Sequence, residues 1–225
     1  MGYSLNRIRQ WDLRVAQRDT HYIANGLITQ KRIREFWGRE APIVYPPVEI
    51  HRFRRSEPED YFLVVGELVR HKQIEVALEA AKRACVPIKV VGTGVDQARL
   101  QAVYGDHAQF LGRIEDTELA ELYSRAKALV MANVEEFGIT AVEAQASGRP
   151  VIAVDGGGAR ETVLNGQTGL FFPFGDVSAL AVAMRHPLLD DMSPAQAVAN
   201  AQRFSVKSFQ NGIAAQVAEA QRSAS

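Results

Sequence analysis

Short apolar runs alternate with helical patterns along most of this chain, and this alternation limits the folds open to it more than any other feature. The segments between the runs carry apolar residues at helical spacing, as in Lys72–Ala84 and Asp116–Ala126. Strands that alternate with helices are typical of a parallel sheet covered by helices on both faces. We therefore predict an α/β fold built on a doubly wound, Rossmann-like parallel sheet. The expected strands are Tyr61–Val65, Ile88–Val91, Gln109–Leu111, Leu129–Ala132, Val151–Val154 and Leu170–Phe172.

The two ends of the chain have a different character. Near the start, Thr29–Trp37 has the pattern of a basic amphipathic helix, and the charged tract Arg52–Asp60 has the composition of a linker. Near the end, residues 193–222 predict one or two amphipathic helices anchored by Phe204 and Phe209. We accordingly divide the chain into an N-terminal region at 1–57, a sheet domain at 58–190 and C-terminal helices at 191–225.

Bulk composition argues against several classes of function. The 26 Lys and Arg residues balance 26 Asp and Glu residues, so overall charge does not favour a nucleic-acid partner. The five histidines have no metal-ligand spacing, and no nucleophile elbow or Walker loop occurs. The one cysteine, Cys85, fits a reducing cytoplasm, and its apolar helical face predicts a buried thiol. No apolar stretch reaches the ~18 residues of a membrane span. We expect a cytoplasmic protein, and its basic amphipathic segments leave peripheral association with the inner face of the membrane open.

Two carboxylates surround a predicted helix start between residues 135 and 144. An apolar strand precedes Glu135, and the spacing after Gly138 is helical, so Glu143 falls one turn inside the helix. The first amides of such a helix have no partners within it, and they form a natural anion site. This pattern favours a sugar nucleotide, because its diphosphate needs N–H donors and its hydroxyls need carboxylate acceptors.

Three further glycine-bearing loops follow predicted strands. Lys72 ends the loop that begins at Gly66, and a cation near a helix start runs against the helix dipole, which suggests a binding task. A solvated surface lysine is the alternative. Gly92-Thr93-Gly94 matches a dinucleotide fingerprint only in part, and Gly156-Gly157-Gly158 is equally typical of a permissive turn. Taken together at one sheet edge, these loops favour a phosphate-binding site.

With these motifs assembled, the chain resembles the retaining glycosyltransferases of the GT-B fold, family four (glycosyl transferases group 1), and within them the mannosyltransferase-like enzymes of bacterial polysaccharide assembly. The resemblance implies that the sheet domain is the C-terminal, donor-binding half of a GT-B fold. It covers nearly all of the chain and is carried by Trp11-Asp12, residues 22–25, 44–48, Gly66 to Lys72, 91–94, 110–114, the Glu135 and Glu143 pair, 146–153 and 157–161.

The resemblance also implies roles for individual residues. Glu135 would bind hydroxyls of the donor sugar, Glu143 the ribose, and Lys72 the diphosphate, so that Lys72 and Glu135 are the expected catalytic residues. Stabilisation of the departing diphosphate by Lys72 and the helix end replaces a divalent metal, and no metal or other cofactor is expected. The implied donor-binding set is Gly66, Glu67, Arg70, Lys72, Gly92, Arg113, Ile114, Glu135, Phe137, Gly138, Ile139, Thr140 and Glu143. The substrate would be a GDP- or UDP-linked sugar, and a hexose would pass with retention to a glycan or lipid-linked acceptor in cell-envelope biosynthesis.

Two features depart from the family pattern. The family usually has an arginine where this chain has Glu67, and a carboxylate there would repel the diphosphate unless Arg70 or His71 compensates. The family's N-terminal acceptor domain, of roughly 150 residues, is not found before residue 1, and residues 1–57 match its last helices and the crossover between domains. A truncated product and one subunit of a split enzyme, with a separate N-terminal-domain partner, both remain open. So do two alternatives in function: a catalytically silent nucleotide-sugar-binding or interaction module, and a nucleotide-sugar epimerase, which would not need this pair of glutamates.

Overall fold

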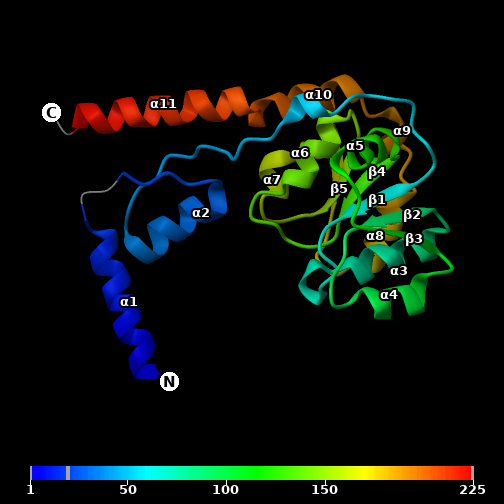
Figure 1. The fold of residues 1–225 in the computed structure, drawn as a ribbon, viewed down its shortest axis with the longest axis horizontal. Helices are drawn as coiled ribbons and strands as arrows, with labels where there is room; N and C mark the ends of the chain where they lie inside the picture. The colour runs from blue at the N-terminus through cyan, green and yellow to red at the C-terminus, as the bar shows by residue number, and fades with distance from the viewer. Residues whose placement is uncertain (1, 19–20, 224–225) are drawn as a thin grey trace. The chain divides into compact units, whose positions relative to one another are not determined.

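The computed structural model describes residues 2–18 and 21–223, which form two compact units (Figure 1). The larger unit runs from Val48 to Ser205 and contains the sheet. The smaller unit combines the described residues before Val48 with those after Ser205. The sheet unit therefore takes in residues 48–57 and 191–205, which lie outside the sheet domain drawn from the sequence. Each unit is described by itself.

The sheet unit is built on six parallel strands in the order β3-β2-β1-β4-β5-β6. Every predicted strand is present, with ends within one residue of those expected, and the predicted fold class is confirmed. The chain moves outward from β1 to β3 and then returns to pair β4 with β1, through Phe62 and Ala128. This return makes a topological switch point between β1 and β4. The strands are β1 (Phe62–Val65), β2 (Ile88–Val91), β3 (Ala108–Gly112), β4 (Ala128–Met131), β5 (Val151–Val154) and β6 (Gly169–Phe172).

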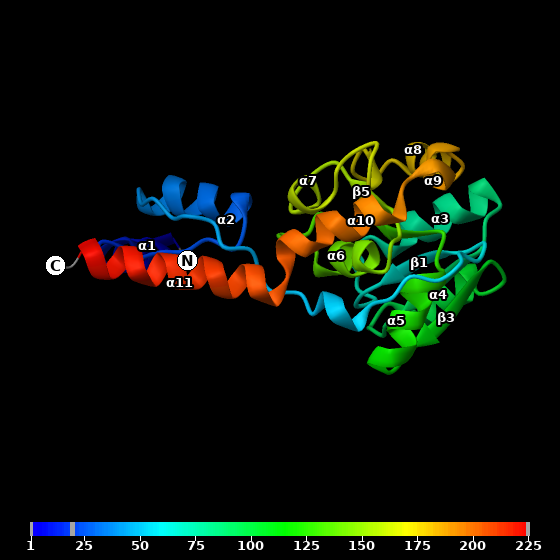
Figure 2. The ribbon, with the colours of Figure 1, turned by 90° about the horizontal axis from the view of Figure 1, so that it is seen from above.

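Helices cover both faces of the sheet, as Figures 1 and 2 show. Alternate residues of each strand point to opposite faces, so Phe62 and Val64 enter one core while Leu63 enters the other. The first core is completed by α3 (Ile74–Ala84), α4 (Gln97–Tyr104), α8 (Val177–Met184) and α9 (Leu188–Asp191). The second is completed by α5 (Asp116–Arg125), α6 (Ile139–Ala146) and α7 (Ala159–Thr162). Because both faces are buried, the strands are apolar almost throughout.

The segment before α3 differs from the predicted helix Lys72–Ala84. Arg70–Lys72 forms a single 3-10 turn, and Gln73 then adopts a left-handed conformation with φ of 54°, so α3 begins only at Ile74. A left-handed residue cannot continue a right-handed helix. As a result Lys72 lies in the loop after β1, and not on the helix.

A buried polar network explains why the last part of the sheet unit extends to Ser205. Helix α10 (Pro194–Ala201) packs on α6, and its Asn200 donates hydrogen bonds to the side chain of Gln145 and to the carbonyl of Thr162. Beyond α10, the amide of Val48 donates to the carbonyl of Phe204 at 2.9 Å. These bonds attach both ends of the unit to the helices over the second core.

The smaller unit is helical. It contains α1 (Gly2–Ala16), α2 (Leu27–Arg32), a turn of π-helix at Ile33–Trp37 and the long α11 (Val206–Ser223). The predicted helix Thr29–Trp37 thus starts at residue 27 and ends in the π-turn. A small core of Ala24, Ile33 and Ala41 packs the segment around α2, and the indole of Trp37 donates to Asp12 of α1 at 2.8 Å.

One prediction about the helices is wrong. Cys85 is exposed, because α3 ends at Ala84 and residue 85 turns off the helix with a left-handed φ of 52°. Its side chain therefore leaves the apolar face that the helical spacing assigned to it. Among residues 2–18 and 21–223, no helix is both long enough and apolar enough to cross a bilayer.

Candidate functional site

The predicted site residues follow the carboxyl ends of the parallel strands, and two of them flank the switch point. Lys72 lies in the loop after β1, and Glu135 lies in the loop after β4, the neighbouring strand. Loops that leave adjacent strands in opposite directions open a crevice at this point of an open α/β sheet, and ligands bind there. The topology therefore brings together residues that are 63 positions apart in sequence.

Lys72 and Glu135 form an ion pair. The Lys72 ammonium lies 2.5 Å from Oε1 of Glu135, and both side chains are about two thirds or more buried, with 25% and 31% of their area exposed. The side-chain amide of Asn133 donates a hydrogen bond to the same oxygen at 2.9 Å. In the described residues Oε2 of Glu135 accepts no hydrogen bond. The pair thus presents one cation and one carboxylate oxygen with capacity for further hydrogen bonds.

Asn133 is a site residue that the sequence reasoning missed. It follows β4 at the carboxyl edge of the sheet, two positions before Glu135. A polar side chain at that edge, after a fully buried strand, was the available signal. Its hydrogen bond fixes the orientation of the Glu135 carboxylate.

The loop from Glu135 to Gly138 rests directly on the triple-glycine loop after β5. The Gly158 amide donates to the carbonyl of Glu135 at 2.8 Å. A Cβ at Gly158 would lie 2.3 Å from the Phe137 backbone, and one at Gly157 would lie 2.2 Å from the Glu135 carbonyl oxygen. These glycines are therefore required by close packing beneath the site loop, which is a structural role. The Phe137 ring itself is buried against Phe204, at 5.4 Å between ring centres.

A similar close approach explains the glycines after β2. A Cβ at Gly92 would lie 1.9 Å from the carbonyl oxygen of Gly66, and one at Gly94 would lie 2.2 Å from that of Leu68. The Leu68 amide also donates to the Thr93 carbonyl at 2.9 Å. The loops after β1 and β2 thus support each other. Gly66 itself has open space where a side chain would begin.

Helix α6 begins at the site loop. Gly138 adopts a left-handed conformation with φ of 85° immediately before Ile139, and no side chain caps the helix. The first amides of the helix, at Ile139 and Thr140, therefore face away from the helix toward the carboxyl edge of the sheet. Ile139 is 47% exposed. An anion at this edge would meet these amides and the positive end of the helix dipole.

Glu143 lies one turn inside α6, where it is largely buried beside helix α5. The hydroxyl of Tyr123 donates to its Oε2 at 2.8 Å. Burial raises the pKa of Glu143 above its usual value, an effect opposed by the Tyr123 hydrogen bond and by the positive charge of Arg52, and reinforced by Asp116. Burial also raises the pKa of Tyr123 well above its usual value, so the phenol stays a donor at neutral pH.

Four predicted donor-binding residues lie at the edges of this arrangement. Glu67 and Arg113 are exposed, and Ile114 packs partly into the second core. Arg70 is exposed and lines a cavity of about 360 Å³ with Glu75, Asp96 and Arg99. The Arg99 guanidinium pairs with both of these carboxylates and lowers their pKa, and the charge of Arg70 lowers both further.

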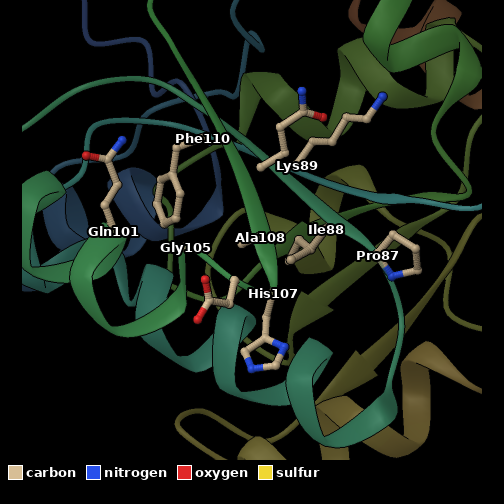
Figure 3. A pocket seen from close by; sticks show the side chains of 10 residues that line it. Pro87, Ile88, Lys89, Gln101, Gly105, His107, Ala108 and Phe110 are labelled. Atoms are coloured by element: carbon tan, nitrogen blue, oxygen red, sulfur yellow. The ribbon is translucent and has the colours of Figure 1, made fainter.

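A larger cavity lies at the opposite edge of the sheet. It has a volume of about 680 Å³ and is formed by the first residues of β2 and β3 and by the end of α4, with Lys89, Gln101 and His107 at its wall (Figure 3). This cavity and the loops that carry Lys72 and Glu135 lie at opposite edges of the sheet, because the amino ends of parallel strands lie at one edge and the carboxyl ends at the other.

In the described residues no group of three or more His, Cys, Asp or Glu side chains has an arrangement that could hold a metal ion.

Comparison with known proteins agrees with this architecture. The family model for glycosyl transferases group 1 matches residues 48–204. Glycogen synthase of Mycobacterium tuberculosis is 37% identical over 153 residues, which cover 63% of this chain and 36% of that protein. GDP-mannose-dependent alpha-mannosyltransferase of Mycobacterium tuberculosis is 37% identical over 126 residues, which cover 55% of this chain and 33% of that protein. The chain thus spans about a third of the length of these curated relatives.

Solved structures share the fold. Sucrose-phosphate synthase from Thermosynechococcus elongatus superposes with a TM-score of 0.81 at 24% identity, covering 96% of this chain and 62% of that one. Anabaena HepE in complex with UDP gives a TM-score of 0.76 at 22% identity, covering 88% of this chain and 64% of that one. At these identities the likeness concerns the fold.

Proposed function

Since the chain belongs to the glycosyl transferases group 1 family, we propose that it carries the donor-binding part of a retaining, metal-independent GT-B glycosyltransferase of family four. Its donor is a nucleotide diphosphate sugar, GDP- or UDP-linked, that carries a mannose-like hexose. The bond between the anomeric carbon and the diphosphate breaks, and the nucleoside diphosphate leaves with the bonding electron pair. The anomeric carbon bonds with the same configuration to a hydroxyl oxygen of a glycan or lipid-linked acceptor, whose proton passes to the departing diphosphate. The chain spans about a third of its curated relatives, so donor binding is the part of the reaction that its own residues can be tested for.

The observation that carries this proposal is the ion pair across the switch point. Lys72 offers a cation to the diphosphate and Glu135 a carboxylate to the sugar hydroxyls, while the amides at the start of α6 add donors for a phosphate oxygen. Negative charge develops on the departing diphosphate, and fixed positive groups stabilise it most where water is excluded. Glu143 would bind the ribose, and the loop at Arg113 and Ile114 the base.

Two names among the known proteins support the choice of donor. A curated relative is described as GDP-mannose-dependent, and Anabaena HepE was solved with UDP. We propose a role in cell-envelope polysaccharide biosynthesis, in the cytoplasm or at the inner face of the membrane, by analogy with the mannosyltransferases among the relatives. The whole enzyme would bind the acceptor and would include any separate N-terminal-domain subunit.

Calorimetric titration of the chain with GDP, UDP, GDP-mannose and UDP-glucose tests the proposal. We expect at least one to bind, and we expect Lys72→Ala to weaken that binding about tenfold or more, because a charge-assisted contact to phosphate is lost. Lys82→Ala, which removes an exposed lysine from α3, is the control and should bind as the wild type does. Failure of all four compounds to bind the wild type would refute donor binding.

Glu67 favours a second candidate, a binding module that does not transfer sugar. An exposed carboxylate in the loop that carries Lys72 repels a diphosphate at short range. Glu67→Arg separates the two candidates: for a site that has lost its diphosphate contact, affinity for GDP or UDP should rise about tenfold. For a site adapted to Glu67, affinity should fall. The reference is Glu118→Arg, an equal charge change on the exposed face of α5.

A further inference from the structure

Tyr123 and Glu143 form a buried pair that the sequence motifs did not include. Tyr123 is fully buried on α5, and its ring meets Phe53 edge-on at 5.7 Å between centres. Its hydroxyl donates to Oε2 of Glu143 on the neighbouring helix at 2.8 Å. The two helices pack against each other, so the phenol and the carboxylate are held by the fold on both sides.

Burying this pair costs free energy. A carboxylate and a phenol both lose hydration on burial, whereas phenylalanine and an uncharged side chain would fill the same volume without that cost. Burial raises the pKa of Glu143, so keeping this carboxylate charged inside the fold costs free energy. Buried charged groups with a shifted pKa are common at functional sites. The position of Glu143 near the site loop is therefore consistent with contact between its carboxylate and a ligand.

The two oxygens of Glu143 have different surroundings. Oε2 accepts from Tyr123, whereas Oε1 accepts no hydrogen bond from the described residues. Every fully buried polar side-chain atom among those residues has a partner, so Oε1 is open to solvent. One oxygen is thus held from within the protein while the other faces outward.

We propose that Tyr123 is a positioning residue of the nucleotide site: it holds the Glu143 carboxylate by one oxygen so that the other accepts from the ribose hydroxyls. The inference rests on the proposed function, since it assumes that a nucleotide binds and that Glu143 meets its ribose. Tyr123 touches no substrate itself. It removes rotational freedom from Glu143 before the nucleotide arrives, and a chain of hydrogen bonds from phenol to carboxylate to ribose strengthens each of its members.

The experiment compares ribose recognition in Tyr123→Phe with that in a matched control. Tyr61→Phe removes the hydroxyl of another buried tyrosine in the same core, which also bonds to α5, but to the carbonyl of Leu122 at 2.7 Å. The probes are GDP and UDP, each with its 2′-deoxy and 3′-deoxy forms. Affinities are measured by calorimetry for the full chain, and a merely structural loss would weaken all forms of the nucleotide alike.

We expect the wild type to prefer the ribonucleotide over the deoxy forms by about tenfold, the value of one hydrogen bond to a charged group. Tyr123→Phe should reduce this preference to about twofold or less, because Glu143 is no longer oriented, while Tyr61→Phe should keep it. A wild type that binds neither GDP nor UDP refutes the proposed function and this inference together. A wild type that prefers the ribonucleotide, with the preference intact in Tyr123→Phe, refutes the inference alone.

A second measurement leaves the buried hydroxyl in place, in case Tyr123→Phe does not fold. With 3-fluorotyrosine installed at position 123, the ¹⁹F resonance should shift when the ribonucleotide binds and shift much less with its 3′-deoxy form. The same label at position 61 should not distinguish the two. An unchanged resonance at position 123 on ribonucleotide binding would contradict the inference.

Discussion

At the scale of single residues, the charged side chains that the site offers for binding lower the stability of the fold because they are buried. Lys72, Glu135 and Glu143 are charged groups that are half or more buried, and each is held by a specific partner. Glu143 is largely buried, and burial raises its pKa. Residues kept for binding commonly weaken the fold in this way.

Glu143→Gln should therefore stabilise the fold at pH 7. The folded pKa of Glu143 lies above the unfolded value of 4.5, so its contribution to stability is complete below pH 4.5 and is lost as the pH rises through the folded pKa. Glutamine removes that loss, while its side-chain oxygen still accepts from Tyr123. Melting temperatures from pH 4 to 8 measure the effect, which should vanish toward the acidic end. Glu118→Gln, on the exposed face of α5, should show no such trend, and a variant less stable than the wild type at pH 7 would contradict the argument.

At the scale of elements, the site depends on loops that carry no binding side chain. The triple-glycine loop after β5 supports the loop that carries Glu135, with backbone packed on backbone. The 3-10 turn and left-handed Gln73 before α3 have a comparable effect, because they keep Lys72 in a loop at the switch point. Lys72 and Glu135 can form their ion pair only if the loops after β1 and β4 keep their conformation.

Gly158→Ala should disturb this support. Its Cβ would lie 2.3 Å from the Phe137 backbone, which cannot move without moving Glu135. Overpacking of this kind costs about 1–3 kcal/mol, and we expect that loss in urea denaturation together with weaker nucleotide binding. Gly156→Ala in the same loop is the matched control, since its Cβ would meet nothing nearer than 3.6 Å and should change stability little. Equal stability of the two variants would show that the loops do not support each other as described.

At the scale of the whole molecule, every predicted donor-binding residue lies in one compact unit. Residues 66–143 fall inside the unit from Val48 to Ser205, which has two cores of its own. Buried Arg149 attaches the first segment of this unit to the rest, because its guanidinium donates to the carbonyl of Ser56, before β1, and to the carbonyl of Ser124 on α5.

A fragment of residues 48–205 should therefore fold alone. We expect a single cooperative thermal transition by circular dichroism, since a unit of this size buries enough apolar surface for independent stability. Its affinity for the nucleotide that the full chain binds should agree within about twofold. The comparison fragment, residues 58–190, omits the Val48 and Asn200 hydrogen bonds and should be less stable. Folding of the shorter fragment with equal stability would contradict the boundaries drawn by the structure.

The sequence alone was enough for the fold class, the six strands, the loop that carries Glu135 and the helix that carries Glu143, because these rest on local hydrophobic spacing and on glycine positions. It failed where conformation at one residue decided the outcome, as at Gln73 and at Cys85, whose left-handed φ no periodicity reveals. It could not pair Lys72 with Glu135, or Tyr123 with Glu143, because these contacts join different strand-helix units. Only the order of strands in the folded sheet brings those units side by side.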